Sequence, residues 1–272
     1  MTPSPILKVL STIRKNGVRS LLMGGQACIL YGGAEFSRDT DIVTVADDEN
    51  LRRLRAAVDE LQAENIAVPP FERRFLEAGH AVHFRCRVPD AQGVRLDVMT
   101  KVRGLPDFQT LWNRRTTVRT AEETIEVLSL PDLVSAKKTQ RDKDWPMTTR
   151  LVEAHYARHV ECSDDTTVDF WLREARSPAI LIDVASRAPA RCRQAMAERP
   201  LLAHAIAGDE SSLVAALRAE EDTEREADRR YWAPLKRELE ALRRERRRDQ
   251  SAPADPADGF RVSGDSMDGD TP

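Results

Sequence analysis

Two aspartates separated by a single residue limit what this chain can fold into. Residues 37–45 read SRDTDIVTV, a strand-like segment in which Asp39 and Asp41 precede the apolar part. Side chains two apart on a strand point to the same face, so the two carboxylates lie about 7 Å apart along it. Like charges this close repel each other, and a divalent cation between them removes the conflict. The spacing therefore predicts a metal site on a strand, with Asp39 and Asp41 as its ligands.

A glycine pair precedes this segment. Gly24 and Gly25 end the apolar run 18–23, which we expect to form another strand. Because glycine has no side chain, backbone amides at such a turn can approach a phosphate group closely. The pair fits neither the P-loop pattern nor the dinucleotide-binding pattern. Glycines for phosphate and carboxylates for metal together predict phosphoryl or nucleotidyl transfer.

A third aspartate lies in a later apolar segment. Residues 81–88 and 94–99 are joined by turn-forming residues and predict a hairpin that carries Asp97 in its second strand. An acid in an apolar strand is unfavourable unless something pairs with it. We expect Asp97 to be the third carboxylate of the site. The alternative is that Asp97 pairs with a core arginine such as Arg85 or Arg95.

Charged residues also recur at helical spacing further along the chain. Pro131 favours the start of a helix. If that helix continues, Lys137, Arg141 and Asp144 lie at positions i, i+4 and i+7 and share one face. A solvated helix face is the alternative interpretation, since lysine and arginine on helices usually serve that purpose.

These motifs resemble the signature of the DNA polymerase beta-like nucleotidyltransferase superfamily. That signature is a glycine pair, a spacer of thirteen residues here, two carboxylates at Asp39 and Asp41, and an acid on another strand. Arg38 and residues 137–144 are similar to the branch that includes abortive-infection nucleotidyltransferase toxins and related uncharacterised bacterial proteins. The resemblance covers roughly residues 18–155. One departure is that many catalytic members have serine after the first glycine, where this chain has Gly25.

The resemblance implies a fold and a role for each of these residues. The fold is α+β, a nucleotidyltransferase fold with a mixed sheet flanked by helices, followed by a helical C-terminal region. The residues expected to be catalytic and to bind Mg²⁺, or Mn²⁺ in its place, are Asp39, Asp41 and Asp97. Those expected to bind the nucleotide are Gly24, Gly25, Arg38, Lys137 and Arg141, and Asp144 is expected to orient the last two.

The expected enzyme transfers a nucleoside monophosphate from a nucleoside triphosphate to a hydroxyl group of RNA, protein or a small molecule. The expected context is the toxin of a toxin–antitoxin or phage-defence pair, with an antitoxin protein as its partner. One alternative is an enzyme that modifies a small molecule of the antibiotic type, for which an acid-lined pocket is expected. Another is a nucleotide-binding module of the same fold without turnover.

Length and composition set the remaining expectations. Of 272 residues, 41% are hydrophobic and 32% are charged, which is ordinary for a protein with a folded core. No apolar run approaches the roughly 20 residues of a membrane span, and the amino terminus has no signal pattern, so we expect a cytoplasmic protein without a membrane partner. Four scattered cysteines predict free thiols.

Changes of composition divide the chain into three parts. We expect a nucleotidyltransferase domain over residues 1–160, a helical region ending in a long charged helix over 161–248, and a disordered acidic tail over 249–272. Pro234 is expected to kink the long helix. His155 and His159, with Cys162 beyond, have a spacing that zinc ligands use, but no fourth ligand is evident and we expect surface histidines.

Overall fold

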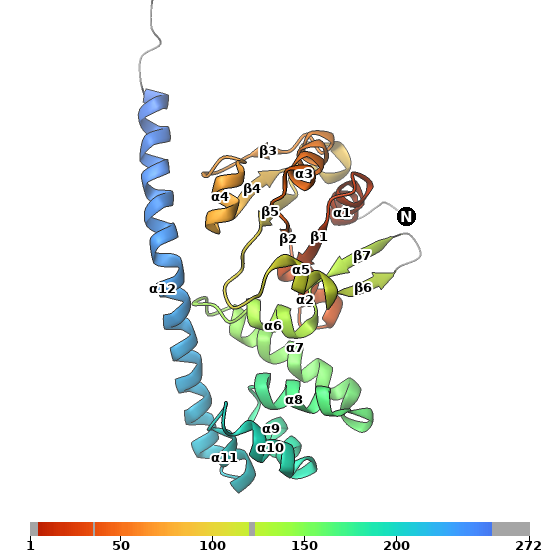
Figure 1. The fold of residues 1–272 in the computed structure, drawn as a ribbon, viewed down its shortest axis with the longest axis vertical. Coiled ribbons are helices and arrows are strands. Elements are labelled where there is room, and N and C mark those ends of the chain that lie inside the picture. The colour runs from red at the N-terminus through yellow and green to blue at the C-terminus, as the bar shows by residue number, and fades with distance from the viewer. Residues whose placement is uncertain (1–4, 35, 120–122, 252–272) are drawn as a thin grey trace, which may run out of the picture.

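A mixed β-sheet forms the centre of the first two thirds of the chain (Figure 1). The structure is a computed structural model that describes residues 5–34, 36–119 and 123–251. In these residues seven strands form one sheet in the order β3-β4-β5-β2-β1-β7-β6. The strands are β1 (Ser20–Met23), β2 (Asp39–Thr44), β3 (Glu64–Asn65), β4 (Val82–Arg85), β5 (Arg95–Met99), β6 (Thr116–Arg119) and β7 (Thr124–Val127).

Helices flank the sheet. They are α1 (Pro5–Lys15), α2 (Gly24–Tyr31), α3 (Asp48–Glu60), α4 (Arg73–Ala78), α5 (Phe108–Asn113), α6 (Leu130–Ala136) and α7 (Asp144–His159), with short 3-10 turns η1 (Pro89–Ala91) and η2 (Val160–Cys162). Beyond them lie α8 (Asp165–Glu174), α9 (Pro178–Arg187), α10 (Pro189–Ala195), α11 (Leu202–Ala207) and α12 (Glu210–Ser251). The predicted fold class, a mixed sheet with flanking helices and a helical C-terminal region, is confirmed.

Local sequence signals account for most element boundaries. Asp47 caps α3 by accepting a hydrogen bond from the backbone amide of Asn50, and Ser129 caps α6 in the same way, with Pro131 in its first turn. The predicted hairpin is the antiparallel pair of β4 and β5. The glycine pair forms the first two residues of α2, directly after β1.

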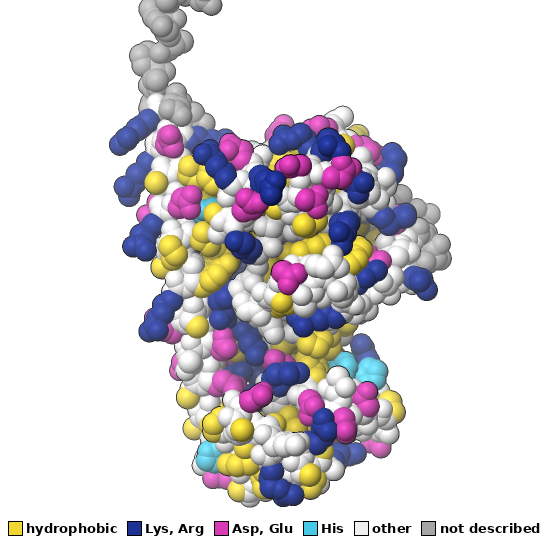
Figure 2. Space-filling model, in the orientation of Figure 1, with side chains coloured by type: hydrophobic (Ala, Val, Ile, Leu, Met, Phe, Trp, Pro, Cys, Tyr) yellow, Lys and Arg dark blue, Asp and Glu magenta, His cyan; other side chains and the backbone are white. Residues whose placement is uncertain are grey.

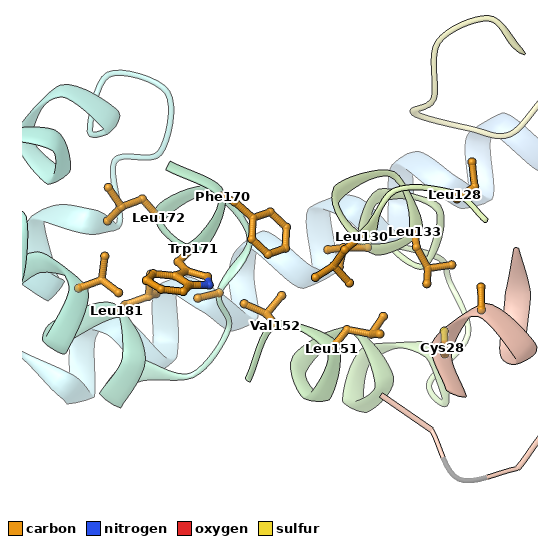
Figure 3. Packing of buried hydrophobic residues seen from close by; sticks show 14 of the residues in the cluster. Cys28, Leu128, Leu130, Leu133, Leu151, Val152, Phe170, Trp171, Leu172 and Leu181 are labelled. Carbon is orange, nitrogen blue, oxygen red and sulfur yellow. The ribbon is translucent and has the colours of Figure 1, made fainter. Parts of the chain in front are cut away.

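Two hydrophobic clusters hold the helices on the sheet. One packs Val9 of α1 and Leu54 of α3 against strands β2, β4 and β5. The other contains α2, α6 and α7 and continues without a break into α8 and α9, as Figure 3 shows from Cys28 to Trp171. The expected domain boundary at residue 160 therefore falls within a shared core, since Phe170 and Trp171 pack with Leu151 and Val152 in that cluster.

Helix α12 is the longest element and stands beside both the sheet and the smaller helices (Figure 1). It is one continuous helix from Glu210 to Ser251 and includes Pro234. Lys and Arg side chains project from the edge that faces away from the sheet (Figure 2). Because α12 extends to Ser251, it includes the first residues of the expected tail, and residues 252–272 lie outside the described part. No helix in that part is long and apolar enough to cross a membrane.

A buried asparagine ties together the elements that carry the first two acids. Asn50 is 2% exposed; it accepts a hydrogen bond from the Arg19 amide and donates to the Thr44 hydroxyl and the Val45 carbonyl. The Arg19 amide lies just before β1, and Thr44 ends β2. Asn50 thereby fixes the strands relative to α3.

Replacing Asn50 with Ala should lower the free energy of unfolding by about 2 to 4 kcal/mol, because several buried polar groups lose their partner. Urea denaturation measures this change. The exposed residue Gln109 supplies a control, since Gln109→Ala should stay within about 0.5 kcal/mol of the parent. Equal stability of the two variants would show that the Asn50 hydrogen bonds contribute nothing.

Candidate active site

The three predicted acids meet at one cleft. β2 and β5 pair in parallel, with Asp41 opposite Asp97, and Asp39 lies two residues before Asp41 on the same face of β2. All three line a cleft with a volume of about 970 Å³. The strand spacing and the parallel register, taken together, bring the carboxylates to one place.

Asp41 is the most perturbed of these acids. Burial raises its pKa to about 6, and the negative charges of Asp97 and Asp39 act in the same direction, whereas Lys137 and a hydrogen bond from the Gly25 amide act against them. A carboxylate held this way is unfavourable in its charged form unless a cation approaches. The donor set thus fits a divalent cation that neutralises Asp39 and Asp41.

Asp97 also has the protein partners that the alternative interpretation predicted. Its Oδ1 atom accepts a hydrogen bond from Arg95 Nε at 2.7 Å and lies 2.8 Å from His83 Nδ1. Arg85, the other predicted partner, is exposed on β4. His83 was missed by the sequence analysis, although its position opposite Asp97 in the hairpin register would have identified it.

The acids do not form a closed metal cage. Among the described residues, no three His, Cys, Asp or Glu side chains come together as a group that could hold a metal ion. Mg²⁺ in nucleotide sites commonly takes only one or two carboxylates and completes its shell with water and substrate phosphates. Asp39 and Asp41 match that incomplete set. His155 and His159 form no metal site by the same criterion. His159 is exposed as expected, whereas His155 is partly buried: its Nδ1 accepts a hydrogen bond from Trp171, and burial lowers its pKa to about 4.

The glycine pair serves packing as well as backbone conformation. Gly24 has φ +68°, and a Cβ atom there would lie 1.9 Å from Asp41 Oδ2. A Cβ atom on Gly25 would lie 2.4 Å from Ser37 Oγ. Both glycines are therefore needed for the loop before β2 to lie against the start of α2. The role of Gly24 and Gly25 in binding phosphate stays a prediction.

The residues predicted to continue one helix with a cationic face form instead a corner between two helices, residues 137–144. α6 ends at Ala136, Lys137 is its cap residue, and α7 begins at Asp144. The corner still brings the predicted side chains together, because Lys137 Nζ lies 3.5 Å from Asp144 Oδ1 and Arg141 Nε donates to Asp144 Oδ2 at 2.7 Å. Burial alone would raise the pKa of Asp144, but these two cations and the Thr139 hydroxyl outweigh burial and lower it. Asp144 thus contacts both Lys137 and Arg141.

Helix α12 supplies a wall of the cleft that the sequence analysis did not assign to the site. Asp228, Trp232 and Lys236 lie one turn apart on α12, and all three line the cleft. Asp228 is 2% exposed and accepts hydrogen bonds from the Gln140 amide at 2.9 Å, Arg103 Nε at 3.1 Å and Trp232 Nε1 at 3.1 Å.

Other hydrogen bonds also attach residues 138–142 to α12 and to Arg103. Arg103 also donates to the Lys138 carbonyl, and Arg225 of α12 donates to the Gln140 carbonyl at 3.1 Å and to Asp142 at 2.7 Å. Lys236 Nζ donates to the Gln140 side chain. Within a continuous helix the Gln140 amide would donate to the carbonyl of residue 136, whereas here it donates to Asp228. Asp228 and its neighbours hold the cationic corner in place.

The sequence matches no known family profile and no curated protein. Solved structures that are similar include the lincosamide antibiotic adenylyltransferase LnuA with lincomycin bound, at 14% identity and a TM-score of 0.40, covering 56% of this chain and 96% of that one. A protein of H. pylori assigned as a nucleotidyltransferase has 13% identity, a TM-score of 0.37 and coverage of 83% and 96%.

An antigenic nucleotidyltransferase-like protein from Paracoccidioides brasiliensis is also similar, at 15% identity and a TM-score of 0.35, covering 65% of this chain and 96% of that one. All three similar proteins are thus nucleotidyltransferases or resemble them by description. Since every TM-score is below 0.5, the proposal below rests on the geometry of the cleft.

Asp41→Asn should stabilise the metal-free protein at neutral pH. Because the pKa of Asp41 is raised in the folded state, its ionisation above about pH 6 favours unfolding, and this penalty is absent below about pH 4, where the group is protonated in both states. The expected gain is on the order of 1 to 3 kcal/mol at pH 8 and near zero at pH 4. Urea denaturation with a chelator present at both pH values measures it. A gain that is the same at both would contradict the assignment.

Asp228→Ala should loosen the corner while leaving β2 unchanged. The Gln140 amide loses its acceptor, so its hydrogen exchange should accelerate on the order of 10-fold or more. Glu226→Ala is the control, because Glu226 lies on the same helix and pairs only with Arg229 and Arg230 among the described residues. Unchanged exchange at residues 138–142 in Asp228→Ala would show that α12 does not hold the corner.

Proposed function

We propose that the chain is a Mg²⁺-dependent nucleotidyltransferase. The observation that carries this proposal is the parallel register that sets Asp41 beside Asp97, with Asp39 on the same face and Lys137 close enough to act on the Asp41 charge. Acids for metal and cations for phosphate therefore face one cleft. The alternative pairing of Asp97 with Arg95 is compatible with this role, because a hydrogen-bonded carboxylate is held in a fixed orientation.

In the proposed reaction, an acceptor hydroxyl oxygen bonds to the α-phosphorus of a nucleoside triphosphate and the bond to the β-phosphate breaks. Asp39 and Asp41 would hold Mg²⁺, which when bound would neutralise charge on the phosphate oxygens. Asp97 takes the hydroxyl proton, and Lys137 and Arg141 contact the departing pyrophosphate from the corner. Asp144 orients both cations through the contacts described above.

The charge of the cleft favours an anionic acceptor over a cationic antibiotic. Among the described lining residues are eight lysines and arginines against five aspartates. The small-molecule alternative called for a pocket lined by acids, and the excess of lysine and arginine over aspartate supports it less well. A nucleic acid end, which carries phosphates, is the acceptor class that this lining suits better. The toxin context, an antitoxin partner and a cytoplasmic location stay predictions from the sequence.

Label transfer from an α-labelled nucleoside triphosphate tests the activity. Asp41→Ala should abolish transfer, and Asp97→Asn should lower turnover by two or more orders of magnitude, about 2.7 kcal/mol, with nucleotide binding largely kept. Asp90→Asn is a matched control, since Asp90 is exposed in the turn between β4 and β5 and lies outside the cleft. Undiminished transfer by folded Asp41→Ala would refute the site.

Binding without any transfer by the parent protein would instead select the non-catalytic module. The same assay should therefore include pooled cellular RNA as acceptor and a titration of nucleotide binding. A parent protein that binds nucleoside triphosphate in the presence of Mg²⁺ but labels nothing, including itself, would support that alternative.

A further inference from the structure

A large apolar side chain stands exposed at the cleft. Phe36 lies in the loop between α2 and β2, three residues before Asp39, and is 71% exposed. It is the most exposed large hydrophobic residue in the described part of the chain, and it lines the cleft. An exposed aromatic ring lacks the favourable free energy of burial, and a ligand in the cleft that covered the ring would supply it.

A cation lies over one face of the ring. The Arg38 guanidinium is 5.6 Å from the centre of the Phe36 ring, and it forms no ion pair with any residue that the structure describes. The opposite face of the ring is the one that a ligand could cover. Arg38 also lines the cleft, next to Asp39. The loop therefore offers a flat apolar surface and an uncompensated positive charge together, directly before the strand that carries the metal-binding acids.

We propose that Phe36 is a stacking surface for the nucleobase of the bound nucleotide, with Arg38 beside it. This inference rests on the proposed function, because the site that it extends is the triphosphate site. A ligand that suits this loop must be flat at one end and anionic at the other, and a nucleotide has both properties. Every nucleobase has a π face, so stacking on Phe36 should tolerate any of the four bases.

Phe36 lies in the loop that leads directly into β2, the strand that carries Asp39 and Asp41. A triphosphate whose metal is held by these acids would therefore have its nucleoside end near this loop. The cleft volume of about 970 Å³ lies at the upper end of the range of ligand pockets and leaves room for an acceptor beside the nucleotide. Ser37, which packs against Gly25, anchors the loop close to the acids.

The test compares nucleotides with a ligand that lacks a base. Titration calorimetry with ATP, GTP, CTP and UTP, each with Mg²⁺, is set against tripolyphosphate with Mg²⁺. Phe36→Ala should weaken the binding of all four nucleotides by about 5- to 100-fold, the range of base–aromatic stacking, and change tripolyphosphate binding less than about 2-fold. Phe36→Trp should restore nucleotide binding and report it by quenching of its fluorescence.

Ile206→Ala is the control, since Ile206 is an exposed apolar residue of α11 that does not line the cleft. It should bind every probe as the parent does. If Phe36→Ala binds nucleotides as tightly as the parent, or weakens tripolyphosphate to the same extent, the stacking role is overturned while the nucleotidyltransferase proposal stands. A parent protein that binds neither nucleotides nor tripolyphosphate would overturn the proposed function itself.

Discussion

The parallel pairing of β2 with β5 is the constraint on which the site depends. It sets Asp41 opposite Asp97 in a partly buried cleft, where burial and the negative charges of Asp97 and Asp39 disfavour the charged form of Asp41. Such an arrangement lowers the stability of the empty protein, and ligands that bring positive charge would restore it. Gly24 at the start of α2 is part of the same constraint, since a side chain at that position would collide with the Asp41 carboxylate.

Much of this region could be predicted because its signals are local. The period-two spacing of Asp39 and Asp41, the turn residues of the β4–β5 hairpin and the capping residues of α3 and α6 all act within a few residues of one another. The partners of Asp97 were harder to predict from the sequence. Arg95 is two residues away and was predicted as an alternative, whereas His83 is set opposite Asp97 only by the register of the hairpin.

The corner between α6 and α7 could not be predicted, for a physical reason. Residues 137–144 have the spacing of a helix, although Thr139 accepts a hydrogen bond from the Arg141 amide and donates one to Asp144 within the corner. The corner is also held by Asp228, which is 88 residues away in the chain and accepts the Gln140 amide hydrogen bond. Tertiary contacts of this kind override local preference. The expected kink at Pro234 stays a prediction. Pro234 lies inside α12 and does not end the helix.

The attachment of the corner to α12 also affects the order in which parts of the site can form while the chain is being synthesised. Synthesis proceeds from the amino terminus, and segments that emerge early can begin to fold before later ones exist. The strands that carry the three acids and the residues of the corner all precede residue 145, but Asp228 and Lys236 are made far later. A nascent chain can therefore assemble the carboxylates long before it can fix the cations that complete the cleft. The site becomes whole only when α12 leaves the ribosome.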